Sequence, residues 1–447
     1  MQNTRWCGVP TLVIMVLACL SPVRPALANP DTTDTHNISI AQLQKSAANG
    51  DADAQYNLGL NYYNGEEVDQ DYKQAFEWYM KAAQQGHAEA QLNIGIMYDN
   101  GQGVDQDYAQ AVSWYQKAAN QGNANAQSNL GVMYENGQGI APDSKQAAFW
   151  YRKAAEQGEV SAQYNLGLLY DNGLGVTQDQ KEAALWYKKA AEQGDVDAQI
   201  NLGTLYETGQ GVPQDYQQAF KYYKLAADQG DMDAQTSLAS FYEEGKGVPK
   251  DYQEAAKWYQ LAAEHGNTDA QANLGVLYDN GDGVPQDYKK AAEWYQKAAA
   301  KGESSAQYNL GMLYEDGNGV PQNYDKAVEL YRQAAAQGDT DAQINLGWCL
   351  LKQGKFDAAK VEIDKAHQLS PEDYSATVNL GHIYLVQGDV QTAQSWYEKA
   401  VVLAGSDQEQ ITVTLEDFDL FIKNGWQVEA SNNARQFFAS KVVNKNN

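Results

Sequence analysis

Glycines recur every 36 residues through most of this sequence. A fixed period of this size is typical of repeat proteins, in which each copy packs only against its neighbours. The period defines eight copies, from Asp51–Gly86 to Glu303–Gly338. The recurring glycines are Gly50, Gly86, Gly122, Gly158, Gly194, Gly230, Gly266, Gly302 and Gly338.

Each copy shows the apolar pattern of two helices. Ala54, Leu58 and Tyr62 fall four residues apart on one helical face, and Gly59 beside them lets a partner helix come close. The second half repeats such a face with Ala75, Trp78 or Tyr79, and Ala82. Because one hairpin cannot bury its own apolar face, the copies must stack. The sequence therefore predicts an all-α solenoid.

The connections within and between the helices are also repeated. Most copies carry Gly-x-Gly-Val between the two helices, as in 101–104, which suits a tight loop with positive φ. Asp71 begins the second helix and Gln74 follows three residues later, a spacing that predicts a capping box. Gly86 then ends this helix as a left-handed cap.

These residues resemble the Sel1-like repeat family. Its pattern, Ala-Gln-x-Asn-Leu-Gly-x-x-Tyr, then Gly-x-Gly-Val, Asp-Tyr-x-x-Ala and Trp-Tyr-x-Lys-Ala-Ala-x-x-Gly, runs for instance from Ala270 to Gly302, and the match covers residues 51–338. The resemblance implies a right-handed α-α superhelix that acts as an adaptor in protein complexes. Bacterial members often serve in the envelope or at the host interface.

The period changes after Gly338. Gly347 and Gly381 are 34 residues apart and a short turn at Gly354 replaces the glycine loop, which resembles the tetratricopeptide repeat. We predict two such repeats over 339–404 and a helical cap over 405–447, although 411–414 could equally be extended. At the other end, 29–50 is predicted to be a linker followed by a capping helix.

The first 28 residues have the pattern of a secretory signal peptide. Arg5 precedes an apolar run that is too short to span a bilayer, and Ala26-Leu27-Ala28 provides a cleavage site. We therefore expect an exported protein, periplasmic or secreted. A lipobox ending at Cys19 is the alternative, but Leu17 suits that motif poorly.

Charge and cysteine content narrow the function classes. Cleavage after Ala28 leaves Cys349 alone, so a disulfide framework is excluded. The full chain has a net charge of −26, and loss of the two leader arginines makes the mature chain two units more negative. Such a surface repels nucleic acid and anionic lipid and favours basic partners. No membrane span is expected beyond the leader.

No catalytic constellation stands out. The histidines lack a second ligand at metal-binding spacing and are interpreted as solvated turn residues. They are His36, His87, His265, His367 and His382. We expect no nucleophile within hydrogen-bond reach of a histidine, no cofactor, no metal site and no enzymatic activity. The recurring tryptophans could suggest a sugar platform, but their helical spacing favours core packing.

One polar position is repeated on a face away from the core. Asparagine stands two residues before the first-helix glycine in nearly every copy; we call these residues the asparagine row. They are Asn57, Asn93, Asn129, Asn165, Asn201, Asn273, Asn309, Asn345 and Asn379. An amide can donate to and accept from a peptide backbone, so the row is the candidate peptide-binding groove. The alternative is that the amides brace neighbouring backbone or only record duplication. In tetratricopeptide relatives, the matching asparagine lines the concave surface.

Acidic residues stand one turn before the row, and we call them the acidic stripe. They are Asp53, Glu89, Asp197, Asp233, Asp269 and Asp341. Together the two features predict an extended, basic peptide as the partner. In the sixth copy Ser237 replaces asparagine and Ala239 replaces glycine, so we predict two row segments, Asn57–Asn201 and Asn273–Asn379.

The predicted function is that of an exported, non-enzymatic scaffold that binds proteins through its groove. The alternatives are an envelope hydrolase or peptidoglycan-acting enzyme, and a secreted effector that binds host proteins. Fold analogy alone does not identify a particular partner.

Overall fold

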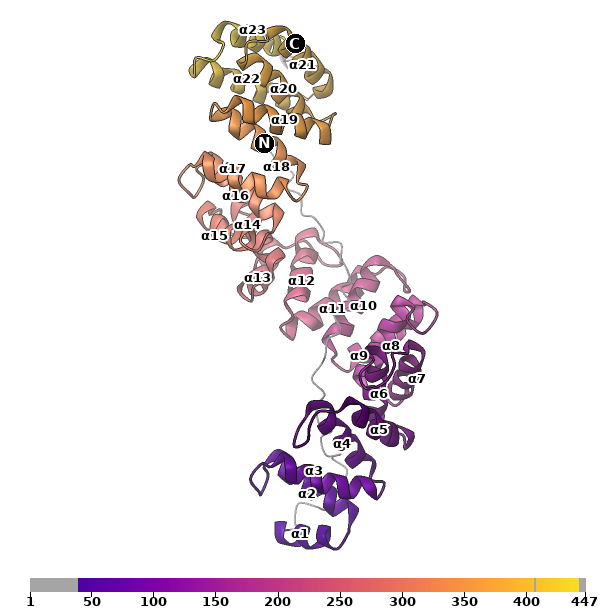
Figure 1. Ribbon diagram of the computed structural model, residues 1–447. Helices are drawn as coiled ribbons and strands as arrows, with labels where there is room; N and C mark the ends of the chain where they lie inside the picture. Colours follow the sequence, from indigo (N-terminus) through magenta and orange to yellow (C-terminus); the bar gives the residue numbers. More distant parts are fainter. Residues whose placement is uncertain (1–38, 406, 442–447) are drawn as a thin grey trace. The chain divides into compact units, whose positions relative to one another are not determined.

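The computed structural model describes residues 39–405 and 407–441, which form 23 α-helices and no β-strand (Figure 1). The predicted leader, Cys19 and His36 lie outside these residues. The first helix, α1 (Ile40–Ala48), packs its Ala47 against Ala54 and Leu58 of the next helix. The helices that follow come in pairs.

The first helices of the eight 36-residue copies have even numbers. They are α2 (Ala52–Asn64), α4 (Ala88–Asn100), α6 (Ala124–Asn136), α8 (Val160–Asn172), α10 (Val196–Thr208), α12 (Met232–Glu244), α14 (Thr268–Asn280) and α16 (Ser304–Asp316). The second helices are α3 (Tyr72–Gln84), α5 (Tyr108–Asn120), α7 (Ser144–Glu156), α9 (Gln180–Glu192), α11 (Tyr216–Asp228), α13 (Tyr252–Glu264), α15 (Tyr288–Ala299) and α17 (Tyr324–Ala335). The remaining helices are α18 (Thr340–Lys352), α19 (Phe356–Leu369), α20 (Tyr374–Val386), α21 (Val390–Ala404), α22 (Gln408–Lys423) and α23 (Val428–Ala439).

The helix ends follow from local chemistry, with one correction. The Asp71 carboxylate accepts the backbone N–H groups of Lys73 and Gln74, as an N-cap should. The predicted reciprocal bond of a capping box is not made in α3. The reason is that the Asp71 N–H already donates to the Tyr62 carbonyl at 2.9 Å, which closes the loop between the two helices.

Glycine allows the close contact inside each hairpin. A Cβ at Gly59 would lie 2.6 Å from the ring of Tyr79, so a larger residue there would force the buried ring to move. In the loop, Gly103 has a φ of 69° and lies directly against the Tyr72 backbone of the preceding copy. The loop glycines therefore serve both the turn and the stacking.

The described chain divides into two compact units, and we describe each by itself. The N-terminal unit comprises residues 39–234 and 246–249, and the C-terminal unit comprises residues 235–245 and 250–441. From α1 to α11 in the N-terminal unit, and from α13 to α23 in the C-terminal unit, each helix contacts the next one along the chain. The predicted fold class, an all-α stack of helical hairpins, is confirmed.

The alternative prediction for residues 411–414 was wrong. Residues 411–414, which could have been extended, lie inside α22. Ile411, Thr414, Phe418 and Phe421 are buried along one side of this helix, at a spacing of three and four residues. The helical period was present in the sequence and outweighs the β-branched residues between 411 and 414.

Candidate functional site

The asparagine row lies where predicted along the first helices, but its members differ in burial. Six amides are half-buried, namely Asn57, Asn129, Asn165, Asn201, Asn273 and Asn345. Asn93, Asn309 and Asn379 are buried, against the expectation of a solvent-facing position. Near Asn93, the His87 ring stacks on Tyr56 with their centroids 4.5 Å apart. A bound peptide could therefore reach the half-buried amides more readily than the buried ones.

The amides also touch tyrosines, which is the bracing role left open by the sequence. Burial is the main cause that raises the pKa of Tyr115 and Tyr151, and hydrogen bonds with Asn129 and Asn165 act against that rise. Asn345 Nδ2 donates to the Tyr308 hydroxyl at 3.3 Å. At Asn129, Asn165 and Asn345, these contacts use part of the hydrogen-bonding capacity of the amide.

A repeated tyrosine–carboxylate pair was missed in the sequence. In seven copies the buried tyrosine of the second helix donates its hydroxyl to an acid near the end of the first helix, as Tyr151 does to Glu135 at 2.7 Å. The pairs are Tyr115–Asp99, Tyr151–Glu135, Tyr187–Asp171, Tyr223–Glu207, Tyr259–Glu243, Tyr295–Asp279 and Tyr331–Glu315. The signal was an acid sixteen residues before each tyrosine.

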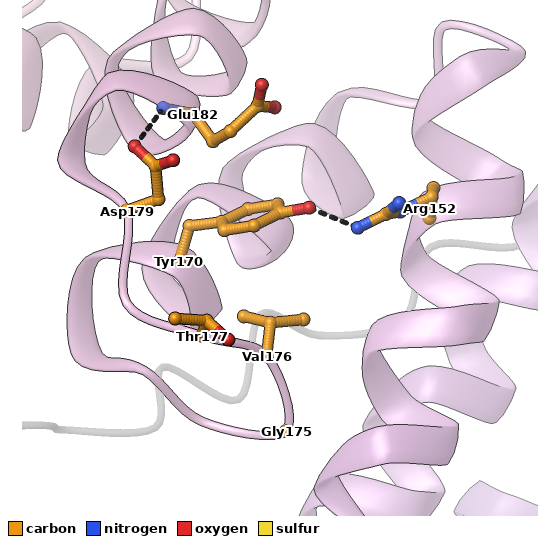
Figure 2. A pocket seen from close by; sticks show the side chains of 7 residues that line it. All are labelled: Arg152, Tyr170, Gly175, Val176, Thr177, Asp179 and Glu182. Atoms are coloured by element: carbon orange, nitrogen blue, oxygen red, sulfur yellow. Dashed lines mark hydrogen bonds between the residues drawn. The ribbon is translucent and has the colours of Figure 1, made fainter.

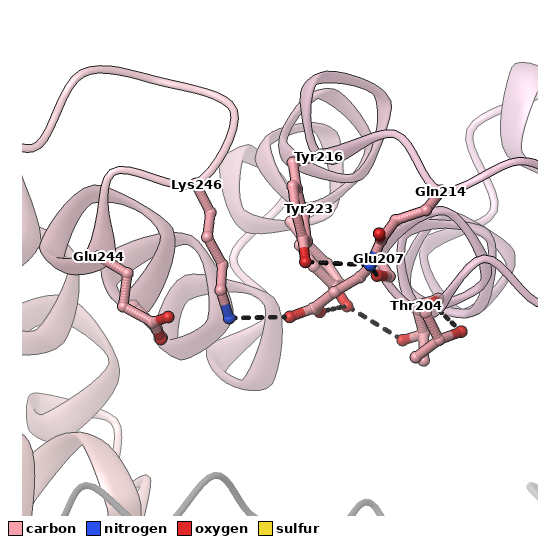
Figure 3. Close-up of polar contacts among 9 residues, drawn as sticks. Thr204, Glu207, Gln214, Tyr216, Tyr223, Glu244 and Lys246 are labelled. Atoms are coloured by element: carbon pink, nitrogen blue, oxygen red, sulfur yellow. Dashed lines mark hydrogen bonds and ion pairs between the residues drawn. The ribbon is translucent and has the colours of Figure 1, made fainter.

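One of these acids links further groups. Glu207 accepts from Tyr223 at 2.8 Å and pairs with Lys246 at 3.7 Å, while the Tyr223 hydroxyl also lies 3.1 Å from Thr204 Oγ1 (Figure 3). In other copies burial raises the pKa of the acid against the hydrogen bond from tyrosine, as for Asp99. Each tyrosine–carboxylate pair links the two helices of one hairpin, which gives it a role in stability.

A buried chain of glutamines joins one copy to the next and was also missed. Gln91 Nε2 donates to the Ala83 carbonyl of the preceding copy at 3.0 Å, and its Oε1 accepts from Gln121 at 2.7 Å. The arrangement recurs at Gln55, Gln127, Gln163 and Gln199. Its signal was the invariant Ala-Gln pair at the start of each first helix.

The first helices carry negatively charged side chains and no lysine or arginine. Helices α2, α4, α6, α8, α10, α12, α14 and α16 all contain acids or amides and contain no lysine or arginine. In the stripe, burial raises the pKa of Asp197 and Asp341, and neighbouring carboxylates add to the rise. Asp197 and Asp341 therefore lie close to other carboxylates, whereas Asp53 and Glu89 lie 3.4 Å and 3.5 Å from the ring nitrogens of His87.

The asparagine row is interrupted in the sixth copy, where Ser237 takes the place of asparagine. Ala239 is fully buried in α12, at the position where the other copies have glycine. The division between the two compact units falls in the same helix, after Ala234. Each unit therefore carries one of the two row segments, Asn57–Asn201 and Asn273–Asn379.

An open hollow of about 610 Å³ lies in the N-terminal unit (Figure 2). Arg152 of α7 points into it and bonds the Tyr170 hydroxyl, and the loop at 175–177 forms another side. Asp179, also at its edge, is engaged as the N-cap of α9, where it accepts the Glu182 N–H at 3.3 Å. The hollow holds opposite charges and shows no arrangement for catalysis.

The interpretation of the histidines as solvated turn residues was wrong at His367 and His382. His367 lies half-buried inside α19, with its ring edge-on to Trp396 at a centroid distance of 5.0 Å. His382 is fully buried in α20, with Nδ1 3.1 Å from the Tyr397 hydroxyl and Nε2 3.3 Å from Asp417 Oδ2. A hydroxyl does therefore lie within reach of a histidine, against expectation. Tyr397 and His382 are closed off by Phe418 and Phe421, so this group joins the cap to α20 and α21 with no path for a substrate.

Two further observations concern the described residues. Residues 39–405 and 407–441 contain no cluster of three or more side chains suited to hold a metal ion. None of their helices combines the length and hydropathy needed to cross a bilayer. Of the recurring tryptophans, Trp114, Trp150 and Trp186 are buried in the second helices as predicted. Trp78, Trp258 and Trp294 are only half-buried, packed against neighbouring apolar clusters.

Known proteins resemble the chain over these same segments. The Sel1 repeat model matches eight consecutive stretches, from 52–87 to 304–339. Tetratricopeptide repeat models match 322–367 and 350–410. A search of curated proteins gave no match.

Solved structures show the same fold. A protective antigen of uropathogenic Escherichia coli strains, described as displaying an SLR fold, is 36% identical, covers 92% of each chain and superposes with a TM-score of 0.78. A Sel1 repeat protein from Oxalobacter formigenes is 37% identical over 68% of this chain and 87% of its own, with a TM-score of 0.52. The chain belongs to the Sel1 repeat family, and tetratricopeptide repeats continue its array.

Proposed function

We propose that this protein is an exported scaffold that binds an extended, basic segment of another protein along its first helices. The observation that carries the proposal is the charge of these helices, which hold acids and no lysine or arginine in any of the eight copies. Five of the eight copies add a half-buried asparagine. The repeat fold is typical of protein-interaction scaffolds, which agrees with this role.

The chemistry of the surface supports a basic and extended partner. Asp197 and Asp341 have raised pKa values because burial and neighbouring carboxylates disfavour their charge, and a cation placed between such acids would relieve that repulsion. The half-buried amides can bond a peptide backbone, which an extended segment exposes. Each row segment lies within one compact unit and can bind independently.

A labelled oligolysine peptide tests the binding proposal. We expect it to bind the full chain with an affinity that falls as salt rises, and we expect Asp53→Asn with Glu89→Gln and Asp197→Asn to weaken it on the order of tenfold. The matched control is Glu156→Gln with Glu192→Gln and Asp228→Asn, which removes the same charge from second helices. Equal losses in both triple variants would show a non-specific response to net charge and would contradict the proposal.

The export proposal rests on the leader pattern and is tested separately. Expression with the full leader should give a released protein whose intact mass corresponds to a start at Asn29. A mass that corresponds to a diacylglyceryl group on Cys19 would contradict cleavage after Ala28 and would indicate a lipid anchor.

A further inference from the structure

Three consecutive second helices of the N-terminal unit expose large apolar side chains. Phe149 on α7 is 48% exposed, Leu185 on α9 is 46% exposed and Leu225 on α11 is 40% exposed. Single exposed apolar side chains are common, but a group of them on neighbouring helices is a candidate interaction surface. We call these three residues, with the lysines beside them, the second-helix patch.

Each of these apolar residues has a lysine one helical turn away. The pairs are Phe149 with Lys153, Leu185 with Lys189, and Lys221 with Leu225. Residues four apart lie on the same side of a helix, so each of the three helices presents one apolar group and one cation together. The first two copies have Glu77 with Lys81 and Ser113 with Lys117 at these positions, without an apolar member.

The three lysines are available to a partner. Lys153 lies over Phe149 at 4.8 Å, Lys189 over Trp186 at 3.7 Å and Lys221 over Tyr222 at 5.2 Å. Among the described residues none of the three forms an ion pair, whereas Lys188 and Lys224 on the same helices pair with Glu192 and Asp228. The patch is therefore apolar with uncompensated positive charge, on a chain whose net charge is −26.

The surface is hollowed beside one of the pairs. A depression of about 440 Å³ is lined by Lys221, Tyr222 and Leu225 of α11 and by Ala191, Glu192 and Gly194 at the end of α9. Its lining also includes Asp228, and the two carboxylates, Glu192 and Asp228, are paired with Lys188 and Lys224. It has room for a large apolar side chain next to the Lys221 ammonium group.

We propose that the second-helix patch docks an acidic protein segment whose carboxylates alternate with large apolar side chains. Apolar side chains would cover Phe149, Leu185 and Leu225, and carboxylates would pair with the three lysines. A short acidic segment is favoured over an anionic membrane because a bilayer would place a large area of negative charge against this strongly acidic chain. This goes beyond the proposed function, since it concerns the second helices and a partner of opposite charge.

The probe is a labelled amphipathic peptide of leucine and glutamate about four helical turns long, titrated into the full chain. The variant combines Phe149→Ser, Leu185→Ser and Leu225→Lys, which are residues that other copies of this protein carry at the same positions. We expect it to bind the peptide at least about tenfold more weakly with an unchanged melting temperature. The matched control, Leu369→Ser with Val402→Ser, removes exposed apolar groups elsewhere and should bind like the original chain.

The charge of the patch is tested in the same titration. Lys153→Gln with Lys189→Gln and Lys221→Gln should weaken binding and flatten its dependence on salt. The same peptide with lysine in place of glutamate should not compete. Absence of binding by the original chain, or equal binding by the patch variant, would overturn the proposal. Binding to phosphatidylcholine–phosphatidylglycerol vesicles that the patch variant loses, without peptide binding, would overturn it in favour of a membrane.

Discussion

The Sel1 copies and the C-terminal helices α18–α23 bury polar groups in different ways. In the Sel1 copies the same tyrosine–carboxylate pair and the same glutamine chain recur with fixed spacing, and each apolar cluster spans about one copy, as that around Trp186 does. In the C-terminal helices the equivalent tyrosine, Tyr397, bonds His382, which reaches Asp417 of the cap. There a single apolar cluster extends from Ala327 to Phe438.

This difference predicts that unfolding is more cooperative in the C-terminal helices than in the Sel1 copies. A stack of small clusters, each shared only with neighbours, should respond locally to damage. A single apolar cluster that includes residues of seven helices, α17 to α23, should respond as a whole.

Two large-to-small substitutions should lower the free energy of unfolding by similar amounts, but the loss of hydrogen-exchange protection should extend over different lengths of the chain. Trp186→Ala and Phe418→Ala should each lower the free energy of unfolding by about 3–5 kcal/mol. Hydrogen exchange should then rise only around α7–α9 in the first variant and throughout α17–α23 in the second. A uniform loss of protection along the chain with Trp186→Ala would break the comparison.

Removal of a tyrosine hydroxyl should be more costly in the C-terminal helices. Tyr397→Phe leaves the fully buried His382 without that partner, which should cost about 1–3 kcal/mol. Tyr151→Phe frees Glu135, which is exposed and can bond water, so its cost should be about 0.5–1.5 kcal/mol. Denaturant unfolding of both variants gives the order, and equal costs would remove the proposed distinction.

Two copies lack the donor glutamine of the glutamine chain, with His265 and Lys301 in its place, and the second of these positions offers a simple repair. Lys301 stands where other copies have the donor glutamine, and Gln271 Oε1 has no hydrogen-bond partner among the described residues. Lys301→Gln should raise the free energy of unfolding by about 1 kcal/mol. The reverse change, Gln121→Lys, should lower it by a similar amount. If Lys301→Gln destabilises, the Lys301 bond to the Gly266 carbonyl matters more than the chain.

Acidification should stabilise the Sel1 copies. Burial raises the pKa of Asp99, Asp171 and Glu243, so the folded state takes up protons at a higher pH than the unfolded state. Stability should therefore rise as pH falls from neutral toward the ordinary carboxyl range. The melting temperature of the Sel1 transition should increase over this interval even in high salt, which screens net repulsion. A steady decrease would show that lowered carboxyl pKa values dominate.

Much of the fold was predictable because the same pattern of apolar residues and glycines recurs in eight copies. Glycine at Gly59 and its equivalents, with apolar residues on both helices, left a stacked hairpin as the only way to bury them. The glutamine chain and the tyrosine–carboxylate pairs left signals of the same kind, but their geometry depends on neighbouring copies. His382 has no equivalent to compare with, and its partner Asp417 lies in a different helix, so its burial could not be inferred from spacing.

The sequence predicted that the asparagine row lies on the first helices, but it did not predict how far each asparagine is buried. A helical wheel places Asn129 and Asn93 at the same angle, yet one is half-buried and the other buried. The difference depends on tertiary neighbours, and at Asn93 these include Tyr56, whose pKa burial raises to about 12. Such contacts are set by side chains one copy away.

The central claim is that the asparagine row binds a peptide and does not only brace the stack. Asn129→Ser with Asn165→Ser, the residue that Ser237 supplies naturally in the sixth copy, tests it directly through peptide affinity and melting temperature in one preparation. We expect oligolysine binding to fall on the order of tenfold, while loss of each bond to a tyrosine hydroxyl costs about 1 kcal/mol or less. A large fall in melting temperature, with binding reduced only in proportion to the unfolded fraction, would contradict the account.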